Sequence, residues 1–315
     1  MMINLIKNEC IKWFKRPSFY VMSSILVGLS VLGLVFVLLL DNMPSSADGP
    51  LDWRQQLERD NETYSEILEG NSFGDISYYE RQIALNEYRL EHNLPPTENY
   101  SVWNFIEDNI GLSSIITLFV IIIAGGMVAS EFSWGTIKLL MIRPIKRSKI
   151  LLSKYIAVFI FTFIFFSLLF ISSFIVGAIF FGFESQPSLQ YFNGEVIAWS
   201  PFAAIVFKLF LQSIAVMMYA TIAFMISSVF RNNSLAIGIS IFLYFTGTTV
   251  TQLVGMKYEW AKFSPFANIN FESVIQGSPL VEGTTLLFSI VMFLLYFIIF
   301  HVISFTVFTK RDIAA

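Results

Sequence analysis

The chain has 315 residues, of which 55% are hydrophobic and only 14% are charged, with a net charge of −3. A soluble domain carries roughly 25% charged residues, so this composition excludes an ordinary soluble protein and predicts a polytopic membrane protein. The single cysteine, Cys10, excludes an internal disulfide framework and a cysteine-thiolate metal cluster.

Six apolar runs are long enough to cross a membrane as helices, since a span needs roughly 20 apolar residues. We predict these spans at residues 19–40, 112–129, 155–183, 209–230, 235–254 and 286–308. The remaining segments are an amphipathic interfacial helix (1–16), two external segments (41–110, 184–208), an external or re-entrant segment (255–285), and cytoplasmic segments (130–154, 231–234, 309–315). The expected fold is an all-α membrane protein with both termini in the cytoplasm and a large helical external loop between spans one and two.

The first sixteen residues have the pattern of a basic amphipathic helix, which would lie in the membrane interface. One helical face carries apolar residues and the opposite face polar ones: Ile3, Ile6, Cys10, Trp13 and Phe14 against Asn4, Asn8, Lys12 and Lys15. A signal peptide is the alternative interpretation, but the apolar run that follows exceeds the usual 7–15 residues and no convincing cleavage site follows it.

The loop at 41–110 holds fifteen acidic and four basic residues. The scarcity of Lys and Arg places it outside the cell. Two helices are predicted in it, at 52–69 and 77–92, and Pro95-Pro96 ends the second. The loop is interpreted as a solvated surface domain. The alternative is that it caps an external cavity or binds cations.

The segment 130–154 holds six of the 20 basic residues, namely Lys138, Arg143, Lys146, Arg147, Lys149 and Lys154. Predicted cytoplasmic regions contain thirteen Lys and Arg and predicted external regions six, with Lys208 at the edge of a span counted in neither, which fits retention of positive charge inside. A short helix is predicted at 136–142, ended by Pro144 and presenting Leu139 and Leu140. This surface would dock a soluble partner; alternatively, the loop only sets the topology.

Few catalytic, metal-binding or ionisable residues are predicted inside the spans. No phosphate-binding loop and no histidine–glutamate or cysteine–histidine metal motif occurs, so no enzyme activity and no cofactor are expected on this chain. His301 is the only ionisable residue predicted well inside a span. With Thr248 and Thr249 it forms a candidate intramembrane polar site, although such residues also serve as ordinary helix–helix contacts. Ion-coupled transporters usually keep more ionisable groups in their spans, so the energy source would be a separate ATP-hydrolysing subunit.

The central motif resembles a known family. Its residues are Glu131 at the end of span two, Gly135-Thr136, Leu139-Leu140, Pro144-Ile145, Arg147, and Lys154 before span three. This pattern resembles the signature region of ABC-2 type permeases, the membrane subunits of bacterial ABC exporters with the type V fold. The six-span layout agrees along the whole chain, and the central segment is its diagnostic part.

The resemblance implies a function and a set of partners. Residues 136–142 would be the coupling helix, with Glu131, Gly135, Thr136, Leu139, Leu140, Pro144 and Arg147 as the ATPase-coupling residues. The partners would be two copies of an ABC-type ATPase that binds ATP and Mg²⁺, a second permease chain (identical or related), and the lipid bilayer, with no nucleic acid. The expected function is export of a peptide antibiotic, drug, lipid or ion across the bacterial plasma membrane, as in multidrug or antimicrobial peptide resistance.

A second hypothesis shares this topology. The chain would be a membrane sensor or immunity protein that does not transport, and its acidic external loop would bind a cationic ligand. The two hypotheses differ in whether the basic segment engages an ATPase.

Overall fold

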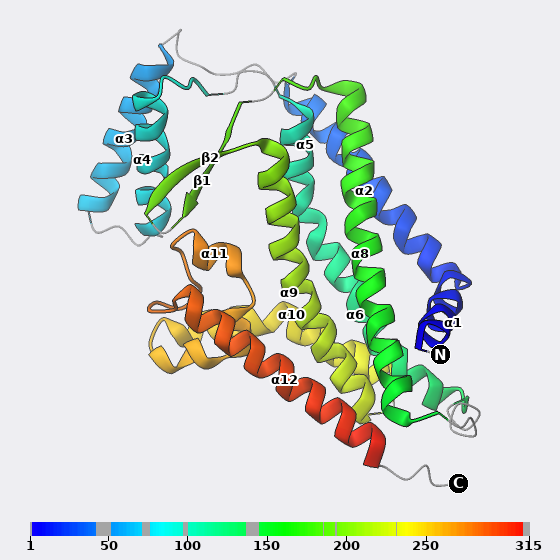
Figure 1. Ribbon diagram of the computed structural model, residues 1–315. Coiled ribbons are helices and arrows are strands. Elements are labelled where there is room, and N and C mark those ends of the chain that lie inside the picture. Colours follow the sequence, from blue (N-terminus) through cyan, green and yellow to red (C-terminus); the bar gives the residue numbers. More distant parts are fainter. Residues whose placement is uncertain are drawn as a thin grey trace.

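The computed structural model describes residues 2–41, 52–70, 76–96, 100–136, 145–184, 186–192, 194–230 and 232–310. Within these ranges, six helices are long and apolar enough to cross a membrane (Figure 1). They are α2 (Pro17–Asp41), α6 (Ser113–Ser133, preceded by α5, Val102–Asn109, and the 3₁₀ helix η1, Ile110–Leu112), α8 (Arg147–Phe180), α9 (Pro201–Phe230), α10 (Asn233–Gly255) and α12 (Leu286–Lys310). The chain is therefore a mostly helical, multi-pass membrane protein.

Two of the long helices begin earlier than their apolar runs. Helix α8 starts at Arg147 rather than at residue 155, and α9 starts at Pro201 rather than at residue 209. At 1.5 Å per residue the 34 residues of α8 extend about 51 Å, well beyond a hydrocarbon core of about 30 Å. Hydropathy marks where a helix becomes apolar, whereas its backbone hydrogen bonds continue into the polar residues before that point.

Helix α6 lies at the centre of the bundle, packed by α8, α9 and α10. Two adjacent glycines allow this close packing. A Cβ on Gly125 would lie 3.0 Å from the Ile237 side chain of α10, and one on Gly126 would lie 3.7 Å from the Trp13 ring of α1 (Met2–Phe14). The two glycines thus let α6 approach α10 and α1 closely.

A pair of helices projects from the end of the bundle opposite α1 and the end of α12 (Figure 1). Helices α3 (Trp53–Glu69) and α4 (Ile76–Glu91) match the predicted boundaries to within one residue. They are joined by a hydrogen bond of 2.8 Å from Asn86 Nδ2 to Asn61 Oδ1 and by the Tyr64 and Tyr79 rings, whose centroids are 5.7 Å apart.

A β-hairpin lies beside α4, so the all-α prediction is wrong at this point. Strands β1 (Ser188–Phe192) and β2 (Glu195–Trp199) pair antiparallel, with Ser188 opposite Trp199. The sequence Asn193-Gly194 between them is a strong hairpin signal. Gly194 has a φ of +96°, which favours glycine because it has no Cβ.

Short helices fill the connection between α10 and α12. They are η2 (Glu259–Phe263), η3 (Pro265–Asn268) and α11 (Phe271–Ile275). Tyr296 of α12 donates a hydrogen bond to the Phe263 carbonyl at 2.8 Å, and the Phe266 ring lies directly against Gly247 of α10. These contacts hold the segment on the side of the bundle.

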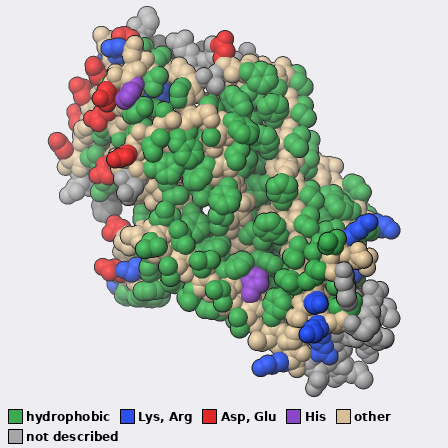
Figure 2. All heavy atoms as spheres, in the orientation of Figure 1, with side chains coloured by type: hydrophobic (Ala, Val, Ile, Leu, Met, Phe, Trp, Pro, Cys, Tyr) green, Lys and Arg blue, Asp and Glu red, His purple; other side chains and the backbone are tan. Residues whose placement is uncertain are grey.

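Charge is separated between the two ends of the molecule. Figure 2 shows Lys and Arg gathered at one end and Asp and Glu at the other. The basic end carries α1, the start of α8 and the end of α12; the acidic end carries α3 and α4 (Figure 1). This polarity is the physical basis for the predicted orientation, in which the basic end faces the cytoplasm.

Cysteine labelling tests this orientation. In a Cys10→Ala background, we expect a membrane-impermeant maleimide to label Glu62→Cys on α3 in intact spheroplasts, and to label Lys310→Cys at the end of α12 only after permeabilisation. Both positions are exposed, so accessibility alone does not distinguish them. The reverse labelling pattern would contradict the predicted orientation.

The contact between Gly247 and Phe266 tests how tightly the η3 segment packs. A Cβ at Gly247 would lie 2.6 Å from the Phe266 ring, so Gly247→Ala forces the ring or α10 to move. We expect a loss of roughly 1–3 kcal/mol in the free energy of unfolding, the usual cost of overpacking. Gly238→Ala on the same helix, where the new Cβ meets no atom within 4 Å, is the matched control and should lose no stability. Equal thermal stability of the two variants in detergent would contradict the packing described here.

Candidate functional site: a buried charge cluster

Four charged side chains from three helices meet at the basic end. Lys154 of α8 lies 2.9 Å from Glu9 of α1 and 3.0 Å from Glu131 at the end of α6. Lys12 of α1 contacts the same two carboxylates, at 3.0 Å from Glu9 and 2.9 Å from Glu131. Each carboxylate thus receives two ammonium groups, and we call these four residues the charge cluster.

The charge cluster is largely removed from solvent. Only 1% of Lys154 is exposed, and Glu9 and Glu131 are also buried, whereas Lys12 reaches the surface. Two positive and two negative groups balance, so the cluster as a whole is neutral and the partly exposed Lys12 completes the compensation of the buried carboxylates. Removing one partner of such a pair is costly, because the remaining charge is left buried without compensation.

Aromatic contacts hold α1 in place beside the cluster. Trp13 is buried, and its Nε1 donates to Met127 Sδ of α6 at 3.2 Å. The Arg16 guanidinium lies 4.2 Å from the centroid of the Trp13 ring and 4.8 Å from that of Trp134.

Burial disfavours the charged form of Lys12, but the carboxylates of Glu9 and Glu131 outweigh this effect and raise the pKa of Lys12 above its ordinary value. Lys12 therefore remains charged at physiological pH.

The first residues of the predicted coupling segment are attached to this cluster. Thr136 Oγ1 donates to a carboxylate oxygen of Glu131. Gly135 has a φ of +70°, a conformation that glycine adopts without strain, and so turns the chain away from α6. The remaining predicted coupling residues Leu139, Leu140 and Pro144, and most of the predicted helix 136–142, lie outside the described residues.

The described chain resumes before α8, and Arg147 stands at the first position of that helix. Its Nη1 donates to the Thr309 carbonyl at 3.2 Å, near the end of α12. Residues 137–144 are therefore flanked on one side by Glu131 and Thr136 and on the other by Arg147 and Lys154. Of the predicted coupling residues, the structure brings Glu131 and Thr136 together, and it places Arg147 against α12.

Sequence reasoning missed half of this cluster. The sequence pattern predicts no role for Glu9, and it places Lys12 on the polar face of the N-terminal helix. Ile3, expected on the apolar face, is 76% exposed, whereas Glu9 is buried. A signal was present, since Glu9 is the sole acidic residue among the first sixteen and Lys154 begins a long apolar run.

The predicted intramembrane residues do not form one site. His301 Nδ1 lies 2.8 Å from the Phe297 carbonyl of its own helix, and its ring packs on Tyr155 with a centroid separation of 4.4 Å. Thr249 lies 3.4 Å from the Phe245 carbonyl of its own helix, within hydrogen-bonding distance. Thr248, in contrast, lines a cavity of about 400 Å³ between α6, α9, α10 and the η3–α11 segment, which we call the polar pocket.

A chain of hydrogen bonds runs from the polar pocket to the acidic end. Ser113 Oγ donates to Gln212 Oε1 at 3.4 Å, and Gln212 Nε2 donates to Glu272 Oε2 at 3.1 Å. Gln276 Nε2 donates to Glu272 Oε1 at 3.3 Å and accepts from Arg81 Nη1 of α4 at 2.6 Å. The α3–α4 pair is thereby connected to the membrane helices α6 and α9 through polar side chains.

Comparisons with known proteins place the chain in a family. Residues 77–314 match the model of a family described as "Protein of unknown function (DUF2705)". The chain belongs to this family. The matched region includes the α6 and α8 members of the charge cluster and excludes α1.

Two relatives from Bacillus subtilis (strain 168) are similar to this chain. "Uncharacterized protein YhcI" is 44% identical over 318 residues, covering 99% of this chain and 100% of the relative. "Uncharacterized membrane protein YdbK" is 30% identical over 204 residues, covering 64% of this chain and 79% of the relative. The second name agrees with the membrane assignment made here from the helices.

Charge removal tests the cluster. We expect Lys154→Met to lower the free energy of unfolding by about 3–5 kcal/mol, since it leaves two buried carboxylates with one partly exposed lysine. The control is Lys208→Met, which removes the ion pair of Lys208 with the partly exposed Glu107 and should cost at most about 1 kcal/mol. Unfolding in detergent, followed by circular dichroism, measures both.

A double variant separates charge from packing. Lys154→Met combined with Glu131→Gln restores the balance of one positive and one negative charge, so it should recover part of the stability lost in Lys154→Met. If the double variant is less stable than Lys154→Met, the loss comes from packing and the electrostatic account of the cluster is wrong.

Proposed function

We propose that this chain is the membrane-spanning permease subunit of an ATP-dependent exporter of the ABC-2 type, driven by a separate ATPase. The observation that carries the proposal is the charge cluster, which ties both flanks of the basic segment to α1. In the resemblance described above, that segment is the surface on which the ATPase docks. A docking segment transmits force only if its ends are held firmly, and the cluster provides this attachment.

The packing supports a route from the docking segment into the membrane. Glu131 ends α6 and Lys154 lies in the first turns of α8, so a push on residues between them acts on both helices together. Helix α6 packs against α9 and α10 along its length. ATP can shift the equilibrium only if one arrangement of these helices binds the ATP-loaded partner better than the other.

The other end of α6 lies at the polar pocket. Ser113, its first residue, lines that pocket with Thr248 and Glu272. In the proposed exporter, a change at the charge cluster reaches this pocket through a single rigid helix. The pocket is therefore the proposed place where substrate contacts the moving helices.

Co-purification tests the proposal directly. We expect the chain to purify with an ABC-type ATPase from the same cell, and ATP hydrolysis by the complex to differ from that of the free ATPase. Leu139→Asp with Leu140→Asp should abolish the complex. Ile76→Asp, at an exposed apolar position on α4 at the acidic end, is the control and should leave the complex intact. A folded, membrane-inserted chain with no associated ATPase would contradict the permease function.

A second variant tests coupling apart from docking. Thr136→Val removes the hydroxyl that donates to Glu131 and keeps the side-chain shape. We expect the ATPase to remain bound while its hydrolysis rate returns toward that of the free enzyme. Thr249→Val removes a hydroxyl that bonds only to the Phe245 carbonyl of its own helix in the described structure. It is the matched control and should leave both ATPase binding and the hydrolysis rate unchanged. Normal stimulation in Thr136→Val would remove this residue from the coupling route.

One observation favours the alternative of a membrane sensor. The hydrogen bonds from Arg81 through Gln276 and Glu272 to Gln212 connect the acidic α3–α4 pair to the membrane helices without involving the basic segment. A cationic ligand on α3–α4 would act through this route. If no ATPase associates with the chain, this is the function that the structure then favours.

A further inference from the structure

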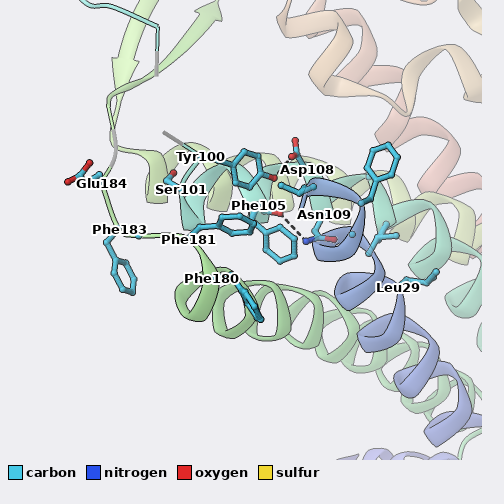
Figure 3. Close-up of a pocket in the computed structure, with 16 residues that line it drawn as sticks. Leu29, Tyr100, Ser101, Phe105, Asp108, Asn109, Phe180, Phe181, Phe183 and Glu184 are labelled. Carbon is cyan, nitrogen blue, oxygen red and sulfur yellow. Dashed lines mark hydrogen bonds between the residues drawn. The ribbon is translucent and has the colours of Figure 1, made fainter. Parts of the chain in front are cut away.

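A cavity of about 1240 Å³ opens at the acidic end, between α2, α5 and the residues that follow α8 (Figure 3). Its lining residues are separate from those of both the charge cluster and the polar pocket. Small-molecule sites usually occupy roughly 300–1,000 Å³, so this cavity has room for a ligand with a long tail.

The walls of the cavity are mostly apolar and aromatic. Figure 3 shows the rings of Tyr100, Phe105 and Phe181 close together. The centroid of the Phe181 ring is 4.7 Å from that of Tyr100 and 5.6 Å from that of Phe105. Phe36 of α2 and Phe180 of α8 complete the wall and are more than half exposed. Since α2 and α8 are membrane-crossing helices, we expect the exposed side of this wall to face lipid.

The polar groups of the cavity are acidic or neutral. Asp108, which accepts a hydrogen bond from the Tyr100 hydroxyl, and Glu184 are its charged side chains; the described lining residues include no Lys, Arg or His. Asn109 Nδ2 donates to the Phe105 carbonyl at 3.0 Å, and its Oδ1 is directed toward Gly33 of α2, where a Cβ would lie 3.2 Å away. Figure 3 shows Glu184 apart from Asp108 and Asn109, so the position beside the apolar wall that favours a positively charged hydrogen-bond donor is at Asp108.

We infer that this cavity binds a membrane amphiphile with a protonated amine head group, which places its tail against the aromatic wall and its ammonium at Asp108. An apolar tail in the cavity is removed from water, and the lipid-facing wall lets the ligand enter from the bilayer. An anionic head group at this position would be repelled by the Asp108 carboxylate. Binding of such an amphiphile requires no ATPase, so it can be tested separately from the proposed export function.

Photo-crosslinking on the full chain in phosphatidylcholine nanodiscs tests the site. The probes are three diazirine-bearing C12 amphiphiles that differ only in the head group: a primary amine, an alcohol and a sulfate. We expect the amine to crosslink to peptides that contain residues 100–112 and 180–184, with higher affinity than the alcohol, and the sulfate to crosslink least. Equal crosslinking of all three would overturn the assignment of the head group.

Neighbouring residues on α5 supply a matched pair of variants. Asp108→Asn should weaken the amine about fivefold, the upper range for a partly exposed ion pair, and leave the alcohol unchanged. Glu107→Gln removes a carboxylate that pairs with Lys208 outside this cavity, so it should leave all three probes unchanged. The same effect from both variants would show that overall charge, rather than Asp108, selects the amine.

A filled cavity should exclude every probe. A Cβ at Gly111, which lines the cavity, meets no atom within 4 Å, so Gly111→Trp can occupy the space without an initial clash. Gly28→Trp on α2, which is equally open and does not line the cavity, is the control. Loss of crosslinking in Gly111→Trp alone, with an unchanged melting temperature, supports the site. Undiminished crosslinking in this variant would overturn it.

Discussion

The arrangement of the basic end depends on the compensation of buried charge. Lys154 is almost completely enclosed and lies between carboxylates that belong to two other helices. Removing these groups from water costs several kcal/mol per ion, and the cost is recovered only when all partners are in place. If α1, α6 or α8 shifted by one helical position, a buried charge would lose its partner. The cluster therefore specifies one mutual arrangement of the three helices, which apolar packing alone defines less sharply.

The middle of the molecule is held together differently. Lipid tails are as apolar as the side chains they replace, so helix association in a membrane relies on close packing and on small residues. Gly125 and Gly126 bring α6 against α10 and α1, and Gly247 brings α10 against Phe266. Charge fixes the helices at one end, and small residues allow their backbones to approach along the rest of their length.

The sequence predicts the parts of this structure that depend on local patterns. Long apolar runs locate the six membrane-crossing helices, and polar stretches with proline locate α3 and α4. It fails where a residue's surroundings come from distant parts of the chain. Glu9 and Lys154 are 145 positions apart, and a helical wheel assigns any charged residue to solvent unless its partner is known. The hairpin is a different failure: Asn193-Gly194 is a sufficient local signal, but it lies in a short connection where no strand was expected.

The position of α6 relates the two polar regions of the molecule. Its last turn carries Glu131 in the charge cluster, and its first residue, Ser113, contacts Gln212 at the polar pocket. Twenty-one residues at 1.5 Å each give about 30 Å, the thickness of the hydrocarbon core. A helix of this length can carry a displacement from one end to the other, because a sharp bend would break backbone hydrogen bonds where lipid offers no replacement. In the exporter proposed above, a force applied at the basic end would act on Glu131 and, through α6, on the polar pocket. In that proposal the charge cluster has a mechanical role in addition to its role in folding.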